Sequence, residues 1–174
     1  MENTEAIVLC GGAGSRLRSI VNDKHKVVAD VAGKPFLTYV LDWLIGHNII
    51  RKSLAAGYYS GTLDPTISFY LKQGIDIRKI VEAKPLGTGG AVRNSLKTIY
   101  SKNFCVCNGD SFLAVDLKDM YSQHKEKKAD LTVALAYPDG REDIGKVVLD
   151  AERRIINFEE KSSSHIEGGL VNGG

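Results

Sequence analysis

The strongest constraint on the fold is an alternation of short apolar runs with segments of helical periodicity. Residues 6–10 form a continuous apolar run of strand length, and residues 35–48 begin with proline and place apolar side chains on one helical face. The pattern continues with expected strands at 52–58, 75–81, 104–107 and 131–137, helices at 64–73, 87–99 and 116–128, and a hairpin at 144–149 and 155–158. Continuous apolar strands that alternate with helices are typical of a parallel sheet covered by helices. We therefore predict a three-layer α/β fold with a central, mostly parallel sheet that becomes mixed toward its end.

Length and composition predict one globular domain. The chain has 174 residues, of which 43% are hydrophobic and 25% charged, which is sufficient for a core that needs no disulfide bonds. The glycine-rich end at residues 168–174 is typical of a turn, so we expect a single domain, 1–174, that is truncated at its C-terminus.

Charge and hydropathy exclude several classes of partner. The 23 basic and 21 acidic residues are mixed along the sequence and leave a net charge of +2, so a dedicated nucleic-acid binder is not expected. No apolar run approaches the roughly 20 residues that span a membrane, and residues 1–5 lack the basic region of a secretory signal. The sequence therefore predicts a cytoplasmic protein with neither a nucleic-acid nor a membrane partner.

A glycine-rich turn follows the first expected strand directly. Residues 11–17 read GGAGSRL, so the backbone N–H groups of the turn can face an anion without obstruction by Cβ atoms. Arg16 adds a charged fork for phosphate oxygens and Ser15 a hydroxyl donor. The segment lacks the lysine of a Walker loop, and Leu17 stands where a dinucleotide fingerprint has its third glycine. The turn therefore favours phosphate binding, with a purely structural turn as the alternative.

Several motifs in this order resemble those of the sugar-1-phosphate nucleotidylyltransferases. The turn at 11–17 matches the family signature, and Lys26 followed by GKPF at 33–36 fits its lysine segment. The run EAKPLGTGGA at 82–91 is similar to the second nucleotide-contacting loop of the family. His25, Val27 and Asp30 depart from the prolines that the family often has around this lysine. The resemblance extends from Ala6 to Gly174 and implies a Rossmann-like nucleotidyltransferase domain.

The resemblance implies a nucleotide-binding set at the first two loops. Its members are backbone or side-chain groups near the strand ends: Leu9, Gly11, Gly12, Gly14, Ser15, Arg16, Glu82, Gly87 and Thr88. Thr88 can either cap the following helix or donate to the ligand. The carboxylate of Glu82 can accept two parallel hydrogen bonds from guanine, whereas uracil offers one such donor. The second loop therefore favours GTP, with a UTP-dependent hexose or muramate 1-phosphate uridylyltransferase as the alternative.

The motif Asn108-Gly109-Asp110 follows the apolar run at 104–107, at the position where the family keeps an aspartate for magnesium. A carboxylate oxygen is the hard ligand that Mg²⁺ prefers, although an Asx turn is the simpler reading of the same residues. By the same resemblance Arg16, Lys26 and Asp110 are the catalytic residues, and Mg²⁺ is the cofactor. The sugar-phosphate side is implied at five positions: Asn108, Gly145, Glu160, Lys161 and Asn172.

These expectations define a reaction and its alternatives. The LGTGGA and NGDS versions of the motifs at 86–91 and 108–111 look most like D-glycero-α-D-manno-heptose 1-phosphate guanylyltransferases. The implied reaction joins a nucleoside triphosphate to a sugar 1-phosphate of the heptose or mannose type and releases pyrophosphate. A catalytically dead nucleotide-binding fragment is the alternative from another class, and homo-oligomerisation is left open.

Overall fold

The computed structural model describes residues 4–11, 25–49, 51–57, 59–137, 146–159 and 169–173. These residues belong to two compact units, Met1–Phe112 and Leu113–Gly174. Within the described residues, no helix is both long and apolar enough to cross a lipid bilayer. The prediction that residues 1–174 form a single domain stays a prediction.

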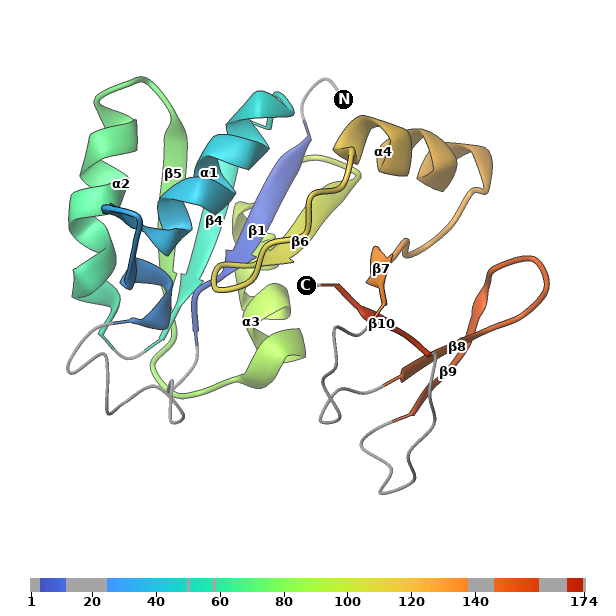
Figure 1. Ribbon diagram of the computed structural model, residues 1–174. Helices are drawn as coiled ribbons and strands as arrows, with labels where there is room; N and C mark the ends of the chain where they lie inside the picture. Colours follow the sequence, from blue (N-terminus) through green and yellow to red (C-terminus); the bar gives the residue numbers. More distant parts are fainter. Residues whose placement is uncertain are drawn as a thin grey trace. The chain divides into compact units, whose positions relative to one another are not determined.

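The first unit is built on a four-stranded, fully parallel sheet (Figure 1). Its strand order is β5-β4-β1-β6, with bounds β1 Glu5–Leu9, β4 Arg51–Ala56, β5 Asp76–Val81 and β6 Phe104–Asn108. The helices are α1 Phe36–Gly46, α2 Asp64–Leu71 and α3 Gly87–Ser95, with 3-10 turns η1 Lys26–Val28, η2 Ser60–Leu63 and η3 Leu96–Thr98. A small ribbon, β2 Asp30–Val31 and β3 Lys34–Pro35, precedes α1. The expected parallel α/β architecture is therefore confirmed.

The alternation of side chains along the central strands places a core on each face of the sheet. Ile7 and Ala55 pack with Ala91 of α3 on one face. Their chain neighbours Val8 and Leu54, which are paired in register, are fully buried on the other face. Figure 1 shows α1 across the sheet, and α1 buries one stripe of its side chains. Helices therefore cover a sheet that is apolar on both faces, as parallel sheets require.

Chain direction makes β1 the switch point of the sheet. The chain moves from β1 to β4 and β5 on one side and then returns to β6 on the other side of β1. In open parallel sheets a ligand crevice forms outside the carboxyl ends of the strands at such a reversal. The loops after β1 and β6 are therefore the segments that the topology places at a binding edge.

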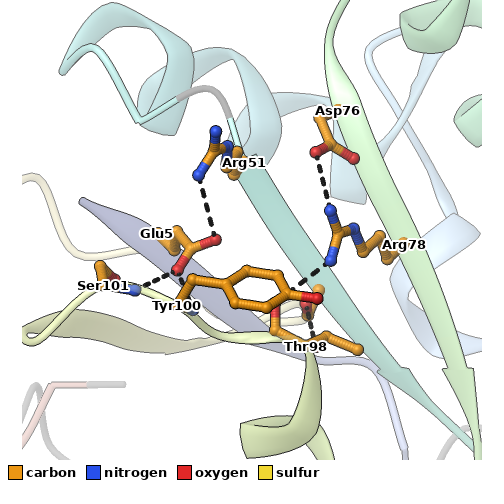
Figure 2. Close-up of polar contacts among 8 residues, drawn as sticks. Glu5, Arg51, Asp76, Arg78, Thr98, Tyr100 and Ser101 are labelled. Atoms are coloured by element: carbon orange, nitrogen blue, oxygen red, sulfur yellow. Dashed lines mark hydrogen bonds and ion pairs between the residues drawn. The ribbon is translucent and has the colours of Figure 1, made fainter. Parts of the chain in front are cut away.

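A network of charged side chains closes the opposite, amino-terminal edge of the sheet (Figure 2). The buried carboxylate of Glu5 accepts hydrogen bonds of 2.6 Å from the backbone N–H groups of both Tyr100 and Ser101, and Arg51 lies 3.8 Å from its other oxygen. Burial alone would raise the pKa of Glu5, but these donors outweigh it and the pKa is lowered. Arg78 forms an ion pair with Asp76, whose carboxylate oxygen lies 3.4 Å away. The network ties β1 to the segment that leads into β6.

The second unit contains one helix and an antiparallel sheet. The helix α4, Leu117–Glu126, begins at Asp116, whose carboxylate accepts from the N–H groups of Lys118 and Asp119. The sheet has the order β7-β10-β8-β9, with bounds β7 Leu135–Ala136, β8 Lys146–Leu149, β9 Ile155–Glu159 and β10 Leu170–Asn172. The β8–β9 hairpin confirms the predicted pairing.

Residues 131–137 do not form the single strand that their sequence predicts. The strand β7 contains only Leu135–Ala136, because its partner β10 pairs with it at just two positions. The helix expected at 87–99 divides into α3 and η3.

Candidate active site

The carboxyl ends of the four parallel strands are held in register beyond the strands themselves. Cys10 N–H donates to the carbonyl of Ala55, Glu82 N–H to the carbonyl of Ala56, and Gly109 N–H to the carbonyl of Leu9. These bonds are 2.8 to 2.9 Å long. They continue the sheet pairing into the loops, so the residues that follow each strand start from one edge.

The start of the glycine-rich turn, Gly11, lies next to the start of the second predicted nucleotide loop, Glu82. A Cβ atom placed on Gly11 would lie 3.7 Å from Glu82 Oε1 and 3.8 Å from the backbone nitrogen of Gly57. The residues that follow β1, β4 and β5 are therefore in van der Waals reach of one another.

Among the described residues, one oxygen of the Glu82 carboxylate has a hydrogen-bond donor and the other has none. Its Oε2 accepts a hydrogen bond of 3.2 Å from the backbone N–H of Leu86. Its Oε1 is shielded from solvent and has no hydrogen-bond partner among the residues that the structure describes. An unpaired, shielded carboxylate oxygen is costly, so this atom can accept a hydrogen bond from a ligand donor.

The helix α3 begins at Gly87, which has a φ of +70° that glycine tolerates without strain. Thr88 is exposed in its first turn, and no side chain caps the helix. Of the two roles expected for Thr88, capping is therefore not used in this structure.

The predicted lysine segment and the predicted magnesium motif contribute one cation and one anion to the same place. Lys26 Nζ lies 3.1 Å from Asp110 Oδ2, with side-chain exposures of 42% and 37%. Lys26 begins η1, whereas Asp110 follows β6, so residues 84 positions apart (110 − 26) form one charged pair. The pair remains open to solvent, which leaves Lys26 accessible to a phosphate and Asp110 accessible to a cation.

Gly109 explains why this pair can form. A Cβ on Gly109 would lie 3.1 Å from Cys10 Sγ, 3.1 Å from Val27 Cγ1 and 3.2 Å from the carbonyl oxygen of Leu9. The lysine turn therefore packs directly against the exit of β6, and glycine allows the close approach. Burial and, after it, the charge of Asp110 raise the pKa of the Cys10 thiol to about 12. Cys10 is thus a neutral packing group and not a nucleophile.

Seven predicted site residues lie outside the described residues: Gly12, Gly14, Ser15, Arg16, Gly145, Glu160 and Lys161. Of the predicted sugar-side residues, Asn108 ends β6 in the first unit and Asn172 ends β10 in the second. The structure therefore brings together Gly11 with Glu82, and Lys26 with Asp110, at one edge of the first unit.

Sequence reasoning missed His25 and Gly57 as site residues. His25 is only 3% exposed, and its ring bonds to the backbone of Gly57. The local sequence carries no signal for this contact, because it joins segments more than 30 residues apart. Among the described residues, no group of three or more histidine, cysteine or acidic side chains could by itself hold a metal ion.

Together, the fold and this edge define an α/β protein of the nucleotide-handling class, with its polar groups at the carboxyl ends of parallel strands. Residues 5–174 match the model of the nucleotidyl transferase family, so the chain belongs to that family. Three of its relatives are named as sugar-1-phosphate guanylyltransferases, and the chain is an enzyme of the nucleotidyl transferase family.

Two relatives carry the name D-glycero-alpha-D-manno-heptose 1-phosphate guanylyltransferase. The protein from Aneurinibacillus thermoaerophilus is 39% identical over 98% of this chain and 72% of its own length. The protein from Campylobacter jejuni is 36% identical over 98% of this chain and 73% of its own. The crystal structure of HddC from Yersinia pseudotuberculosis has a TM-score of 0.81 and 30% identity, and covers 98% of this chain and 74% of that one. A second structure of that protein, complexed with GMP-PN, has a TM-score of 0.80 and 29% identity over the same shares.

Proposed function

We propose that the protein transfers the nucleotidyl group of GTP to a sugar 1-phosphate of the heptose type and releases pyrophosphate. The observation that carries the proposal is the Lys26–Asp110 pair, 3.1 Å apart, on the same strand-end edge as Gly11 and Glu82. The names of the two guanylyltransferase relatives support the choice of sugar and base.

The reaction requires charge neutralisation more than acid–base chemistry. An oxygen of the sugar 1-phosphate forms a bond to the α-phosphorus of GTP, and the bond from that phosphorus to the bridging oxygen breaks. Pyrophosphate takes the electron pair of the broken bond. The nucleophile is already an anion, so no side chain needs to remove a proton. The main obstacle is the approach of two polyanions, and positioned cations reduce it.

The cationic side chains take separate parts of this task in the proposal. Lys26 contacts the phosphates of the nucleotide, and Arg16 contacts the triphosphate and the leaving pyrophosphate. Lys161 contacts the incoming phosphate, and Glu160 accepts from sugar hydroxyls. Gly145, Asn108 and Asn172 are the remaining residues proposed for the sugar side.

Asp110 is the residue that would hold Mg²⁺. Its carboxylate is partly exposed and forms an ion pair with Lys26. A bound triphosphate offers Lys26 other anionic oxygens, so Lys26 can release Asp110 for the metal ion. When bound, magnesium supplies positive charge against the phosphate oxygens. A single carboxylate rarely suffices for Mg²⁺, so we expect metal binding without nucleotide to be weak.

Glu82 is proposed to select guanine. Its Oε1 needs a donor, and the Leu86 N–H bond to Oε2 holds the carboxylate in a fixed orientation. Guanine presents N1–H and N2–H on one edge, whereas uracil presents a single N–H. One N–H of uracil can satisfy Oε1, but only guanine supplies a second hydrogen bond, which Oε2 can accept beside the bond from Leu86.

The test is pyrophosphate release with Mg²⁺, a panel of sugar 1-phosphates, and either GTP or UTP. We expect turnover with GTP to exceed that with UTP by at least about tenfold, because only guanine supplies two hydrogen bonds to the Glu82 carboxylate. Glu82→Gln should lose this preference, whereas Glu126→Gln, an exposed residue on α4, should retain it. An enzyme that favours UTP would contradict the guanine assignment and support the uridylyltransferase alternative.

The binding-fragment alternative has its own outcome in the same experiment. If no sugar 1-phosphate leads to pyrophosphate release while calorimetry detects GTP binding, the protein binds nucleotide without catalysis. We expect Arg16→Ala to abolish both activity and binding. A cytoplasmic location is part of the proposal. Homo-oligomerisation stays a prediction, which these assays do not test.

A further inference from the structure

His25 begins the turn that carries Lys26 and is almost completely buried, with 3% exposure. Its backbone N–H donates to Thr62 Oγ1 at 3.3 Å, and its carbonyl accepts from Val28 N–H at 3.0 Å. The second bond closes η1, while the first attaches the turn to η2. The backbone of His25 is therefore held from two sides.

The side chain of His25 supplies a third attachment. The ring hydrogen-bonds to the backbone of Gly57, an interaction that favours the protonated ring and so uses the Gly57 carbonyl as acceptor. Nε2 is buried without a partner among the described residues, which leaves Nδ1 as the donor. Burial lowers the pKa of His25 despite the opposing effect of Gly57. The ring is therefore a neutral N–H donor at neutral pH.

Both anchors of His25 are themselves fixed. Thr62 donates through both its N–H and its hydroxyl to the carbonyl of Tyr59, at 2.9 Å each. A Cβ on Gly57 would lie 3.7 Å from Gly11 Cα, so Gly57 touches the start of the glycine-rich loop. The ring of His25 thus ties the lysine turn to the same strand exit that meets Gly11.

We propose that His25 is a positioning residue, whose buried ring fixes the lysine turn to the exit of β4 and thereby holds Lys26 at Asp110. The inference rests on the proposed function in one respect, namely that Lys26 acts on the phosphates of the nucleotide. A buried ring in a hydrogen-bonded turn limits the motion of the adjacent Cα. The long lysine side chain then has fewer placements available, and the Lys26–Asp110 geometry is pre-organised.

Kinetics of His25 variants test the inference. Because misplacement of a charge near the reacting phosphates acts on the transition state, we expect His25→Ala to lower kcat about 10- to 100-fold with little change in the KM of the sugar 1-phosphate. His25→Asn should recover most of the rate, since the amide places an N–H donor near the position of Nδ1. His47→Ala is the matched control with wild-type rates expected: the His47 ring nitrogen Nδ1 also bonds a backbone carbonyl, that of Trp43 at 2.9 Å, but at the other end of α1.

A double variant separates positioning from loss of folded enzyme. If His25 acts through Lys26, the double variant His25→Ala, Lys26→Met should be no slower than Lys26→Met alone. A rate loss that multiplies in both backgrounds would contradict the inference, because it would mean that His25→Ala only reduces the amount of folded enzyme.

The chemical reactivity of the Lys26 amine can be measured without catalysis. Competitive labelling with an amine-reactive reagent, followed by mass spectrometry, gives the reactivity of Lys26 relative to the exposed Lys118. We expect the relative reactivity of Lys26 to rise several-fold in His25→Ala and to stay unchanged in His25→Asn and His47→Ala. Equal labelling in all four proteins would overturn the inference, even where the wild-type enzyme is active. Absence of pyrophosphate release by the wild type with increased labelling in His25→Ala would instead contradict the proposed function alone.

Discussion

Among single residues, Lys52 carries the clearest energetic cost in the fold. Its side chain is 2% exposed on β4, and Nζ has no hydrogen-bond partner among the residues that the structure describes. Burial lowers the pKa of Lys52 to about 8, although Asp42 and Asp76 act in the opposite direction. The protonated form of this lysine therefore destabilises the folded state at neutral pH.

We predict that Lys52→Met stabilises the protein at pH 7. The shift of the pKa from 10.5 to about 8 corresponds to a cost on the order of 1–3 kcal/mol once relaxation is allowed for, and methionine removes it. The folded-state pKa lies below the unfolded one, so between pH 8 and 10.5 the unfolded chain binds more protons than the folded chain. The cost therefore disappears as the pH rises through this window, and the advantage of methionine should shrink.

Urea unfolding of wild type and variant at pH 7 and pH 9.5 measures both parts of this prediction. The exposed Lys72→Met is the control, for which no pH-dependent difference is expected. A Lys52→Met variant that is less stable than wild type, or a difference that does not change with pH, would refute the assignment of a buried charge.

The sequence predicted some site residues because the residue type itself carries the chemistry. Glu82 directly follows β5 and Asp110 lies two residues after β6, and topology alone brings such positions to one edge. His25 differs, because its role depends on contacts with Gly57 and with Thr62 that local periodicity does not encode.

At the scale of elements, the site depends on how closely the lysine turn approaches the strands. Gly109 lies where β1, η1 and β6 meet, and two of its three near neighbours are a buried thiol and a backbone carbonyl. Neither the carbonyl of Leu9 nor the packed Cys10 can move away easily.

We predict that Gly109→Ala destabilises the protein by about 1–3 kcal/mol, because the added methyl group overpacks this junction. It should also lower the rate of pyrophosphate release, since the methyl group pushes Val27 and with it the lysine turn. Thermal unfolding and the pyrophosphate assay measure the two effects. Gly61→Ala is the control, because a Cβ there meets nothing within 4 Å. Equal stability and activity of Gly109→Ala and wild type would show that the junction is not closely packed.

Elements were predictable where their own residues determine them and less so where a partner does. The apolar stripe of α1 and the strand-length runs of β1, β4 and β5 are local patterns, and the structure has them near the expected positions. The length of β7 is set by its pairing with β10, which residues 131–137 alone do not reveal. The turn η1 and the ribbon β2–β3 likewise depend on packing against α1 and on the left-handed residues Ala32 and Gly33.

At the scale of the whole molecule, the central claim is that strand ends from different parts of the chain form one site for a nucleotide and its metal. The parallel order β5-β4-β1-β6 places the carboxyl ends of β1 and β6 side by side, and the Lys26–Asp110 and Gly11–Glu82 contacts agree with that placement. Membership of the nucleotidyl transferase family is consistent with the same arrangement.

Calorimetric titration of GTP into the wild type and Asp110→Asn, with and without Mg²⁺, tests this claim most directly. The account predicts that Mg²⁺ tightens GTP binding to the wild type, because Asp110 and the phosphates share the ion, and that Asp110→Asn removes most of this Mg²⁺ dependence while magnesium-free binding persists. The same Mg²⁺ dependence in both proteins would contradict the account, since the metal would then be held elsewhere than at the end of β6.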